Sequence, residues 1–266
     1  MQGVEIPEMP EEVMLLQTEL SSKFANSGGV AGIIEKNTTI SGEVMRMANS
    51  PSSKLPQPVI SIRQAVDVLG MNRLYNLVVT AALNNCFSGK KLLKDILDNS
   101  VDVAFCMTDL ADWVDGVSRD EAYMLGLFHN VGALLLASKD EKKYEAFYLR
   151  SMSMPNTVLS EENSAYGSNH TMTGVLVAKK WLLPNEMIQA IMLHHNNACE
   201  KISNPKIRAM VAMLKIANVL VSEISMNAFL SEETRNYMND GVQELLIPDE
   251  VISEIRTALL SYSFKC

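Results

Sequence analysis

The chain has 266 residues, of which 47% are apolar and 20% are charged. A chain of this size and composition can bury a large core, which excludes an intrinsically disordered protein. Its net charge of −8 argues against a nucleic-acid-binding surface, because such surfaces need clustered lysine and arginine.

The sequence shows no sign of export or of a membrane span. Its four cysteines form no CxxC pair, which is typical of reduced thiols in a cytosolic protein. The first residues are acidic and lack the basic and apolar regions of a signal peptide. No apolar run reaches the roughly 18 residues of a transmembrane helix. We therefore expect a soluble cytoplasmic protein with no membrane or nucleic-acid partner.

The hydrophobic periodicity of the first part of the chain is that of short amphipathic helices. Pro10 can begin a first helix, which Gly28 and Gly29 then stop. Ser61 and Gln64 form a capping-box pattern at the start of a later helix. In this part of the chain, helices are predicted over 30–36, 40–50, 61–70 and 73–87, with a proline-rich loop at 51–58.

The most apolar segment of the chain follows a second capping box, formed by Ser118 and Glu121. It runs over 121–138, and we expect it to be one central, buried helix. Gly126 and Gly132 within it lower helix propensity by about 1 kcal/mol each relative to alanine. Their presence favours a close approach of neighbouring backbones.

The remaining segments are also helical in pattern, and no pair of strands or internal repeat is evident. Further helices are predicted over 91–115, 171–183, 185–196, 205–224 and 248–262. Residues 139–160 are more charged and predict a helix and a loop. The predicted fold class is therefore all-α.

All four histidines of the chain lie in segments that are helical in pattern. They are His129, His170, His194 and His195. Neutral imidazole is the commonest side chain that binds transition metals, so this grouping points to a metal centre. Asn130, however, stands beside His129 where a metal enzyme needs a carboxylate.

Two groups of motifs resemble the HDOD family, the HD-related output domain of bacterial signalling proteins. The first group, MANS and SIRQAVDVLG, lies within 44–74, and the second, LFHNVG and a W-LP-AI-HH block, lies within 125–196. The resemblance covers about residues 5–220. It implies an all-α fold in which an N-terminal helical layer, here 1–90, packs on an HD-like helical core, here 91–266 with its C-terminal helices. It also implies a role in transmitting a regulatory signal, usually through protein contacts and in some members with nucleotide sensing.

The resemblance further implies where a metal site would lie. In catalytic HD relatives, a histidine, a His-Asp pair and a later aspartate hold a divalent metal. The matching positions here are Asn99, His129 with Asn130, and Asn218. Asparagine offers only a neutral carbonyl oxygen, which is a weak ligand for Zn, Fe or Mn. The loss of two carboxylates and one imidazole predicts a degenerate pocket with no catalytic residue, metal or cofactor.

The histidines left in this pocket allow two interpretations. His129, His170 and either His194 or His195 could bind an adventitious metal ion or an anion. The alternative is that they are buried polar residues, hydrogen-bonded to nearby asparagines. Those asparagines are Asn130, Asn169 and Asn218. We favour the alternative, because adjacent side chains on a helix point about 100° apart and cannot easily share one centre.

The sequence therefore predicts a non-catalytic bacterial regulatory module that binds a signalling protein, with a nucleotide as a further candidate ligand. The alternative function is a divergent HD-type, metal-dependent phosphohydrolase acting on a nucleotide or phosphodiester. It would need ligands beyond the family pattern, and Glu161 and Glu162 are candidates. Motifs of phosphate-binding loops, dinucleotide-binding folds and zinc proteases are absent from the sequence.

Overall fold

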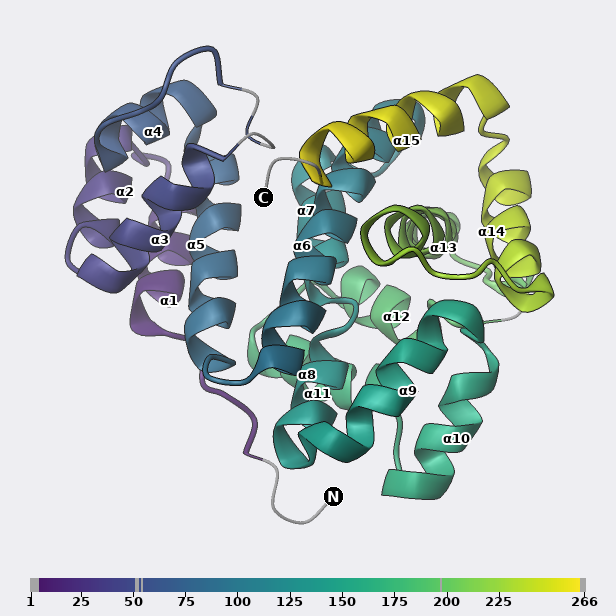
Figure 1. Cartoon of the computed structure of the whole chain (residues 1–266). Helices are drawn as coiled ribbons and strands as arrows, with labels where there is room; N and C mark the ends of the chain where they lie inside the picture. The colour runs from purple at the N-terminus through teal and green to yellow at the C-terminus, as the bar shows by residue number, and fades with distance from the viewer. Residues whose placement is uncertain (1–4, 51–52, 54, 197, 264–266) are drawn as a thin grey trace. The chain divides into compact units, whose positions relative to one another are not determined.

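The computed structural model describes residues 5–50, 53, 55–196 and 198–263. Throughout these residues the regular secondary structure is helical, without a β-strand (Figure 1), which confirms the predicted all-α class. None of the described helices has both the length and the hydropathy that a membrane span requires. The chain divides into two compact units, one formed by Glu8–Cys86 and the other by the segment up to Pro7 together with Phe87–Cys266. The domain boundary predicted between residues 90 and 91 stays a prediction.

The smaller unit, Glu8–Cys86, is a group of short helices around an apolar core. Its helices are α1 (Glu11–Leu20), α2 (Ser27–Ile34), α3 (Thr38–Ala48), α4 (Ile62–Leu69) and α5 (Met71–Cys86). Helix α5 is buried along most of its length and packs against α1 and α3. Helices α2, α3 and α4 begin where the side chains of Asn26, Asn37 and Ser61 accept hydrogen bonds from backbone N–H groups.

The glycine pair of this unit does not end the first helix, contrary to the sequence prediction. Helix α1 ends at Leu20, and Gly28 and Gly29 lie in the first turn of α2. The Asn26 side chain accepts a hydrogen bond from the Gly29 N–H at 3.0 Å. This cap satisfies one of the free N–H groups at the helix start, so it outweighs the low helix propensity of glycine.

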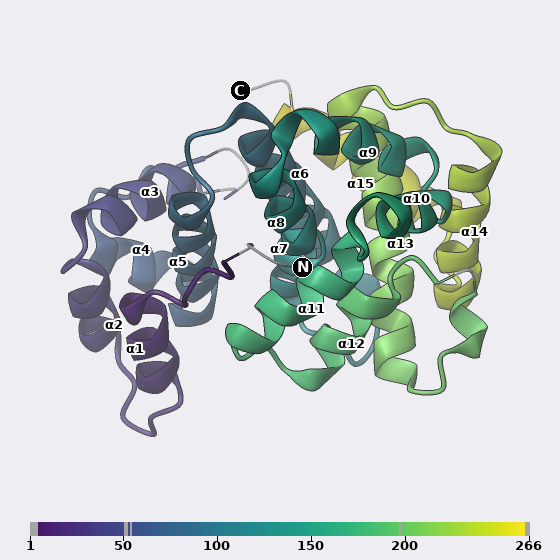
Figure 2. The same ribbon diagram turned by 90° about the horizontal axis from the view of Figure 1, so that it is seen from below.

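The larger unit contains the longer helices. They are α6 (Lys91–Leu110), η2 (Ala111–Trp113), α7 (Arg119–Phe128), α8 (Val131–Lys139), α9 (Glu141–Ser153), α10 (Thr157–Tyr166), α11 (His170–Lys180), α12 (Asn185–Leu193), η3 (Cys199–Lys201), α13 (Pro205–Met226), α14 (Glu232–Leu245) and α15 (Asp249–Ser263). Helix α13 is central in this unit and packs against α6, α12, α14 and α15 (Figures 1 and 2). The capping box of Ser118 and Glu121 forms as predicted at the start of α7.

The apolar segment over 121–138 is two helices, not the single helix that the sequence predicted. Nδ1 of His129 lies 2.6 Å from the carbonyl oxygen of Gly126. In a continuous helix this oxygen would accept the N–H of Asn130. The ring therefore competes with the helix for its own backbone, and Asn130, with φ −105° and ψ 14°, leaves the helical region. This break places His129 and Asn130 at a helix junction.

Two glycines allow close helix packing beside this junction, which confirms the prediction made for them. A Cβ atom at Gly126 would lie 2.5 Å from the Cα of Ala104 in α6. A Cβ at Gly132, in α8, would overlap the carbonyl oxygen of His170, the first residue of α11. Thr173 strengthens the second approach by donating its hydroxyl to the Gly132 carbonyl at 3.2 Å. The absence of a Cβ at Gly132 therefore allows the start of α11 to lie against α8.

The segment that precedes the smaller unit belongs to the larger one. The Lys180 ammonium donates a hydrogen bond to the Ile6 carbonyl at 3.0 Å. The indole N–H of Trp181 donates to the Pro7 carbonyl at 3.1 Å, and Trp181 is buried. Ile6 and Pro7 thus pack against the end of α11.

Candidate functional site

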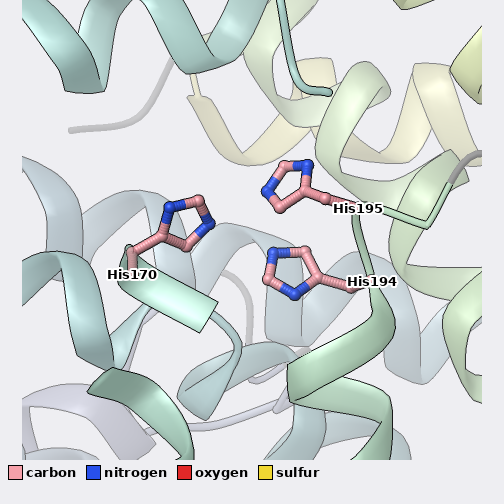
Figure 3. Close-up of side chains that lie close together, drawn as sticks. All are labelled: His170, His194 and His195. Carbon is pink, nitrogen blue, oxygen red and sulfur yellow. The ribbon is translucent and has the colours of Figure 1, made fainter. Parts of the chain in front are cut away.

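The four histidines come together inside the larger unit. His129 lies between α7 and α8, His170 begins α11, and His194 and His195 follow the end of α12. The rings of His194 and His195 have centroids 4.1 Å apart, and the His170 ring lies 4.8 Å from that of His195 and 5.5 Å from that of His194. Figure 3 shows these three rings around a common space. The His129 ring lies 5.5 Å from that of His194.

The His194 and His195 rings lie closer together than the sequence predicted for neighbours on a helix, with centroids 4.1 Å apart. The candidate ligand atoms of His170, His194 and His195 all lie within 4.8 Å of one another. The argument assumed a regular helix through both residues, but α12 ends at Leu193 and the pair lies in the turn that follows. His194 itself keeps helical dihedral angles, with φ −63° and ψ −20°.

In three of the histidine rings, the Nδ1 atom lies within hydrogen-bonding distance of an acceptor oxygen, which fixes the orientation of the ring. Nδ1 of His129 faces the Gly126 carbonyl at 2.6 Å, and Nδ1 of His194 faces the Ile191 carbonyl at 2.7 Å. Nδ1 of His170 faces a carboxylate oxygen of Glu162 at 2.8 Å. Because carbonyl and carboxylate oxygens only accept, each of these Nδ1 atoms carries a proton.

Of the asparagines that the sequence suggested as partners, Asn218 interacts with the His129 ring and raises its pKa, whereas Asn169 has a different role. The Asn169 side chain caps α11 by accepting from the Met172 N–H at 3.0 Å. The histidine Nδ1 atoms use two main-chain carbonyls and Glu162 instead. Of the two candidate glutamate ligands, Glu161 forms an ion pair with Arg150 and Glu162 is fully buried against His170.

Burial keeps several of these imidazoles neutral. Burial, with a smaller effect of the nearby His170, lowers the pKa of His129 to about 4. Burial also holds the pKa values of His194 and His195 well below the usual 6.5, and repulsion between the neighbouring rings acts in the same direction. At neutral pH these three rings are uncharged, so their free nitrogens are available as electron-pair donors.

A small cavity of about 30 Å³ adjoins the cluster. Four of the residues singled out by the sequence line it: Asn99, Asn130, His195 and Asn218. The structure therefore brings the three asparagine positions together, and His129, His170 and His194 lie outside the cavity wall. The rest of its lining consists of Tyr148, Ser151, Met152, Pro155, Val219, Ser222, Thr234 and Tyr237.

The lining of this cavity does not fit the metal centre of catalytic HD relatives. None of its lining residues in the described part of the chain is a carboxylate, and amides stand at the three matched positions. The Nδ2 atom of Asn99 is buried and has no hydrogen-bond partner there. An amide N–H₂ group is a donor and cannot ligate a cation. The imidazole cluster beside the cavity is a different set of donors, made of nitrogen alone.

A second network, which the sequence analysis missed, holds the turn that carries the histidine pair. The buried Lys215 ammonium lies 2.5 Å from Asp240 and donates to the Asn196 carbonyl at 2.5 Å. The hydroxyl of Tyr237 donates to the His194 carbonyl at 2.9 Å, and the Tyr237 ring stacks on that of His195. One signal was present in the sequence: Lys215 is a lone charge within an otherwise apolar helical stretch.

Comparison with known proteins identifies one matching domain family. The HDOD domain matches residues 6–197. An uncharacterised protein of Treponema pallidum is 22% identical over 196 residues, which are 72% of this chain but 38% of that relative. The chain thus spans well under half the length of that relative.

Two solved structures share the fold. A protein from Marinobacter aquaeolei, described as a proposed signal transduction protein, aligns with a TM-score of 0.76 and 20% identity, covering 98% of this chain and 58% of the other. A proposed phosphohydrolase from Shewanella amazonensis aligns with a TM-score of 0.70 and 21% identity, covering 96% and 90% of the two chains. The sequence match, the helical fold and the histidine block at the α7–α8 junction lead to one assignment: this chain belongs to the HDOD domain family.

Proposed function

We propose that this chain is a non-catalytic regulatory module of signal transduction, and that it acts by binding a protein partner. The observation that carries the proposal is the amide lining of the cavity. Asn99, Asn130 and Asn218 converge there, at the positions where catalytic HD relatives hold a metal. Neutral amides supply none of the negative charge that holds a divalent cation and balances it during phosphoryl transfer.

The size of the cavity supports a protein partner over a nucleotide. Sites for small organic ligands usually enclose about 300–1,000 Å³. The cavity beside the histidines encloses about 30 Å³, which suits one or two water molecules. A nucleotide bound there would have to displace buried side chains. The description of the Marinobacter aquaeolei neighbour as a proposed signal transduction protein is consistent with this assignment.

The catalytic part of the proposal is tested by restoring the missing ligands. The wild-type chain, loaded with Mn²⁺, Mg²⁺ or Zn²⁺, should hydrolyse a generic phosphodiester and a phosphomonoester no faster than the metal-only blank. The triple variant Asn99→His, Asn130→Asp and Asn218→Asp should bind Mn²⁺ more tightly than wild type in a competition titration. Wild-type turnover that is lost in His129→Gln would overturn the non-catalytic assignment.

The binding part of the proposal needs an independent measurement. Cross-linking in cells of the source organism, followed by mass spectrometry, should identify a partner enriched over a matched unrelated bait. The purified pair should then associate with a dissociation constant in the micromolar range or tighter by calorimetry. If no protein is enriched, or if no enriched protein binds the purified chain, a protein-binding role is contradicted.

A phosphohydrolase is the second candidate function. The imidazole cluster beside a cavity favours it, because three imidazoles can hold a zinc ion that acidifies water. The Shewanella amazonensis neighbour, a proposed phosphohydrolase, has the same fold. The turnover assay above separates this candidate from the regulatory module.

A further inference from the structure

Helix α10 is held in the larger unit by little apolar surface of its own. Of its ten residues, two are buried, Val158 and Glu162. Its chief packing partner is α9, and Figure 1 shows the two helices side by side at the periphery of the unit. Segments with few buried apolar contacts open at a lower free energy than the core of a protein. An opening of α10 should therefore be far easier than unfolding of the whole unit.

The start of α10 is held by a carboxylate from another helix. Glu233, in the first turn of α14, accepts hydrogen bonds from the backbone N–H groups of Asn156 and Thr157 at 2.6 and 3.0 Å. It also accepts one from the Thr157 hydroxyl at 2.7 Å. Asn156, the N-cap residue of α10, provides no side-chain cap of its own. Because the free N–H groups of a helix start need an acceptor, Glu233 acts as a latch on this end of α10.

Residues beside this latch hold the turn that precedes α10. The hydroxyl groups of Ser231 and Thr234 both donate hydrogen bonds to the Ser153 carbonyl, the second at 2.9 Å. Pro155, in the same turn, and Thr234 line the cavity of about 30 Å³. The turn therefore closes one side of the cavity, and its release would admit solvent.

The middle of α10 covers the imidazole cluster with the carboxylate of Glu162. This fully buried group accepts hydrogen bonds from Nδ1 and from the backbone N–H of His170, both at 2.8 Å, and from the Tyr144 hydroxyl at 2.7 Å. No lysine or arginine in the described part of the chain forms an ion pair with it. A buried carboxylate is costly without a full positive charge beside it. Opening returns water to Glu162, which offsets part of the contacts that are lost.

The contacts between α10 and α9 lie close to the surface. The ion pair of Arg150 and Glu161 has side chains that are 47% and 32% exposed, and pairs of this kind contribute little to stability. The rings of Phe147 and Tyr166, both partly exposed, meet edge to face with centroids 5.6 Å apart. These contacts guide α10 back into place without holding it firmly.

We propose that residues 154–166 form a gate over the cavity and the imidazole cluster, latched by Glu233. The gate opens locally while the rest of the larger unit stays folded. In the closed state Glu162 orients the His170 ring, and in the open state that ring loses its partner and meets solvent. Any molecule that binds the open state better than the closed one shifts the chain toward it. This inference concerns the isolated chain and is independent of the proposed regulatory function.

Hydrogen exchange of the full wild-type chain, followed by mass spectrometry, tests the local opening. Amides within 158–166 should exchange at least about 100-fold faster than those of α11 and α13. Their exchange rate should change little in low concentrations of urea, because a local opening exposes little surface. Equal protection of α10 and α11 in the wild-type chain would overturn the proposal. This measurement needs no variant, so it stands even if a substitution prevents folding.

Glu233→Gln tests the latch. The amide keeps one acceptor oxygen but loses the charge, so exchange within 158–166 should become about tenfold faster while α11 and α13 stay as in wild type. Glu232→Gln is the matched control, since Glu232 is the exposed neighbour in the same helical turn and carries the same charge. Its exchange should remain within about twofold of wild type. Equal acceleration in both variants would refute the role of Glu233.

The reactivity of His170 links the latch to the imidazole cluster. Diethyl pyrocarbonate modifies accessible imidazoles, so it should modify His170 faster in Glu233→Gln than in wild type. The factor should match that of amide exchange, because both rates scale with the open population. His170 in Glu232→Gln should react as in wild type. Faster exchange of α10 without faster modification of His170 would show that the helix frays without uncovering the cluster, and would contradict the gate.

Discussion

Asp102, in α6, shows how burial controls protonation at a single residue. Burial raises the pKa of its carboxyl to about 6; the Ser225 hydroxyl, donating at 3.0 Å, lowers it, and the nearby Asp98 raises it. An aspartate in an unfolded chain has a pKa of about 3.9. The folded state therefore binds this proton more tightly. Its contribution to stability is present below about pH 4 and is lost as the pH rises through about 6.

We therefore expect Asp102→Asn to stabilise the protein at neutral pH. The amide keeps an acceptor for Ser225 and carries no charge, so the free energy of unfolding should rise by about 1–3 kcal/mol at pH 7.5. The gain should be smaller at pH 4.5, where the wild-type carboxyl is mostly protonated. Urea unfolding at both pH values measures the difference. Asp115→Asn, at an exposed position, is the control, and an equal gain from both variants would refute the explanation.

At the residue scale, the sequence was sufficient for part of the site. The family resemblance placed Asn99, Asn130 and Asn218 in one predicted pocket; these residues line one cavity, and its identity as a degenerate metal site stays a prediction. The contact between Glu162 and His170 was not predictable, because it joins two helices whose packing depends on the whole unit. Side-chain partners across helices leave no periodic signal in the sequence.

At the scale of elements, the approach of α8 to α11 depends on one missing methyl group. A Cβ at Gly132 would overlap the His170 carbonyl. We expect Gly132→Ala to lower the free energy of unfolding by about 2–4 kcal/mol, because backbone atoms on the facing helix cannot yield as a flexible side chain can. Gly42→Ala in α3 is the matched control. A Cβ there meets open space, so a gain of up to about 1 kcal/mol is expected. Similar effects of the two variants in chemical denaturation would contradict this interpretation.

Helices α13 and α14 are joined by the buried pair of Lys215 and Asp240. Lys215→Met should cost about 3–5 kcal/mol, since it leaves a carboxylate without its cation and the Asn196 carbonyl without its donor. Adding Asp240→Asn should recover part of that loss, because the amide carries no charge. A double-mutant cycle by urea unfolding measures the coupling. Strictly additive losses would show that the pair does not act as a unit.

Helix positions were largely predictable because apolar spacing and capping residues act locally. Ser118 and Glu121 form their capping box as the sequence indicated. The break at His129 was not predicted, since propensity and periodicity both favour a helix through this segment. The hydrogen bond from the ring to the Gly126 carbonyl decides the outcome, and it depends on a rotamer that no pattern of residue types reveals.

For the whole molecule, the division into two units provides a test of independence. All four histidines lie in the larger unit, so their imidazole NMR signals report on that unit alone. Leu16, in α1, is fully buried in the smaller unit. We expect Leu16→Ala to destabilise that unit by about 3 kcal/mol. At intermediate urea, the histidine signals should remain native while amide signals from 8–86 are lost.

The matched variant for this experiment is Leu134→Ala, at a buried position in α8 of the larger unit. It should disturb the histidine signals first. Simultaneous loss of both sets of signals in each variant would mean that the chain unfolds as one cooperative unit. The all-α class and the family were within reach of the sequence, but whether the two units unfold separately was not, because it depends on tertiary contacts.

The anchoring of Ile6 and Pro7 on the end of α11 has a practical consequence for protein engineering. A deletion that simply starts the polypeptide at Phe87 would remove the two carbonyls that accept from Lys180 and Trp181. The buried indole would then lose its acceptor and expose the apolar surface beneath it. An internal deletion, in which a short glycine-serine linker joins Pro7 to Phe87 in place of the helices of the smaller unit, would retain both acceptors. It is the version of the isolated larger unit that we would express.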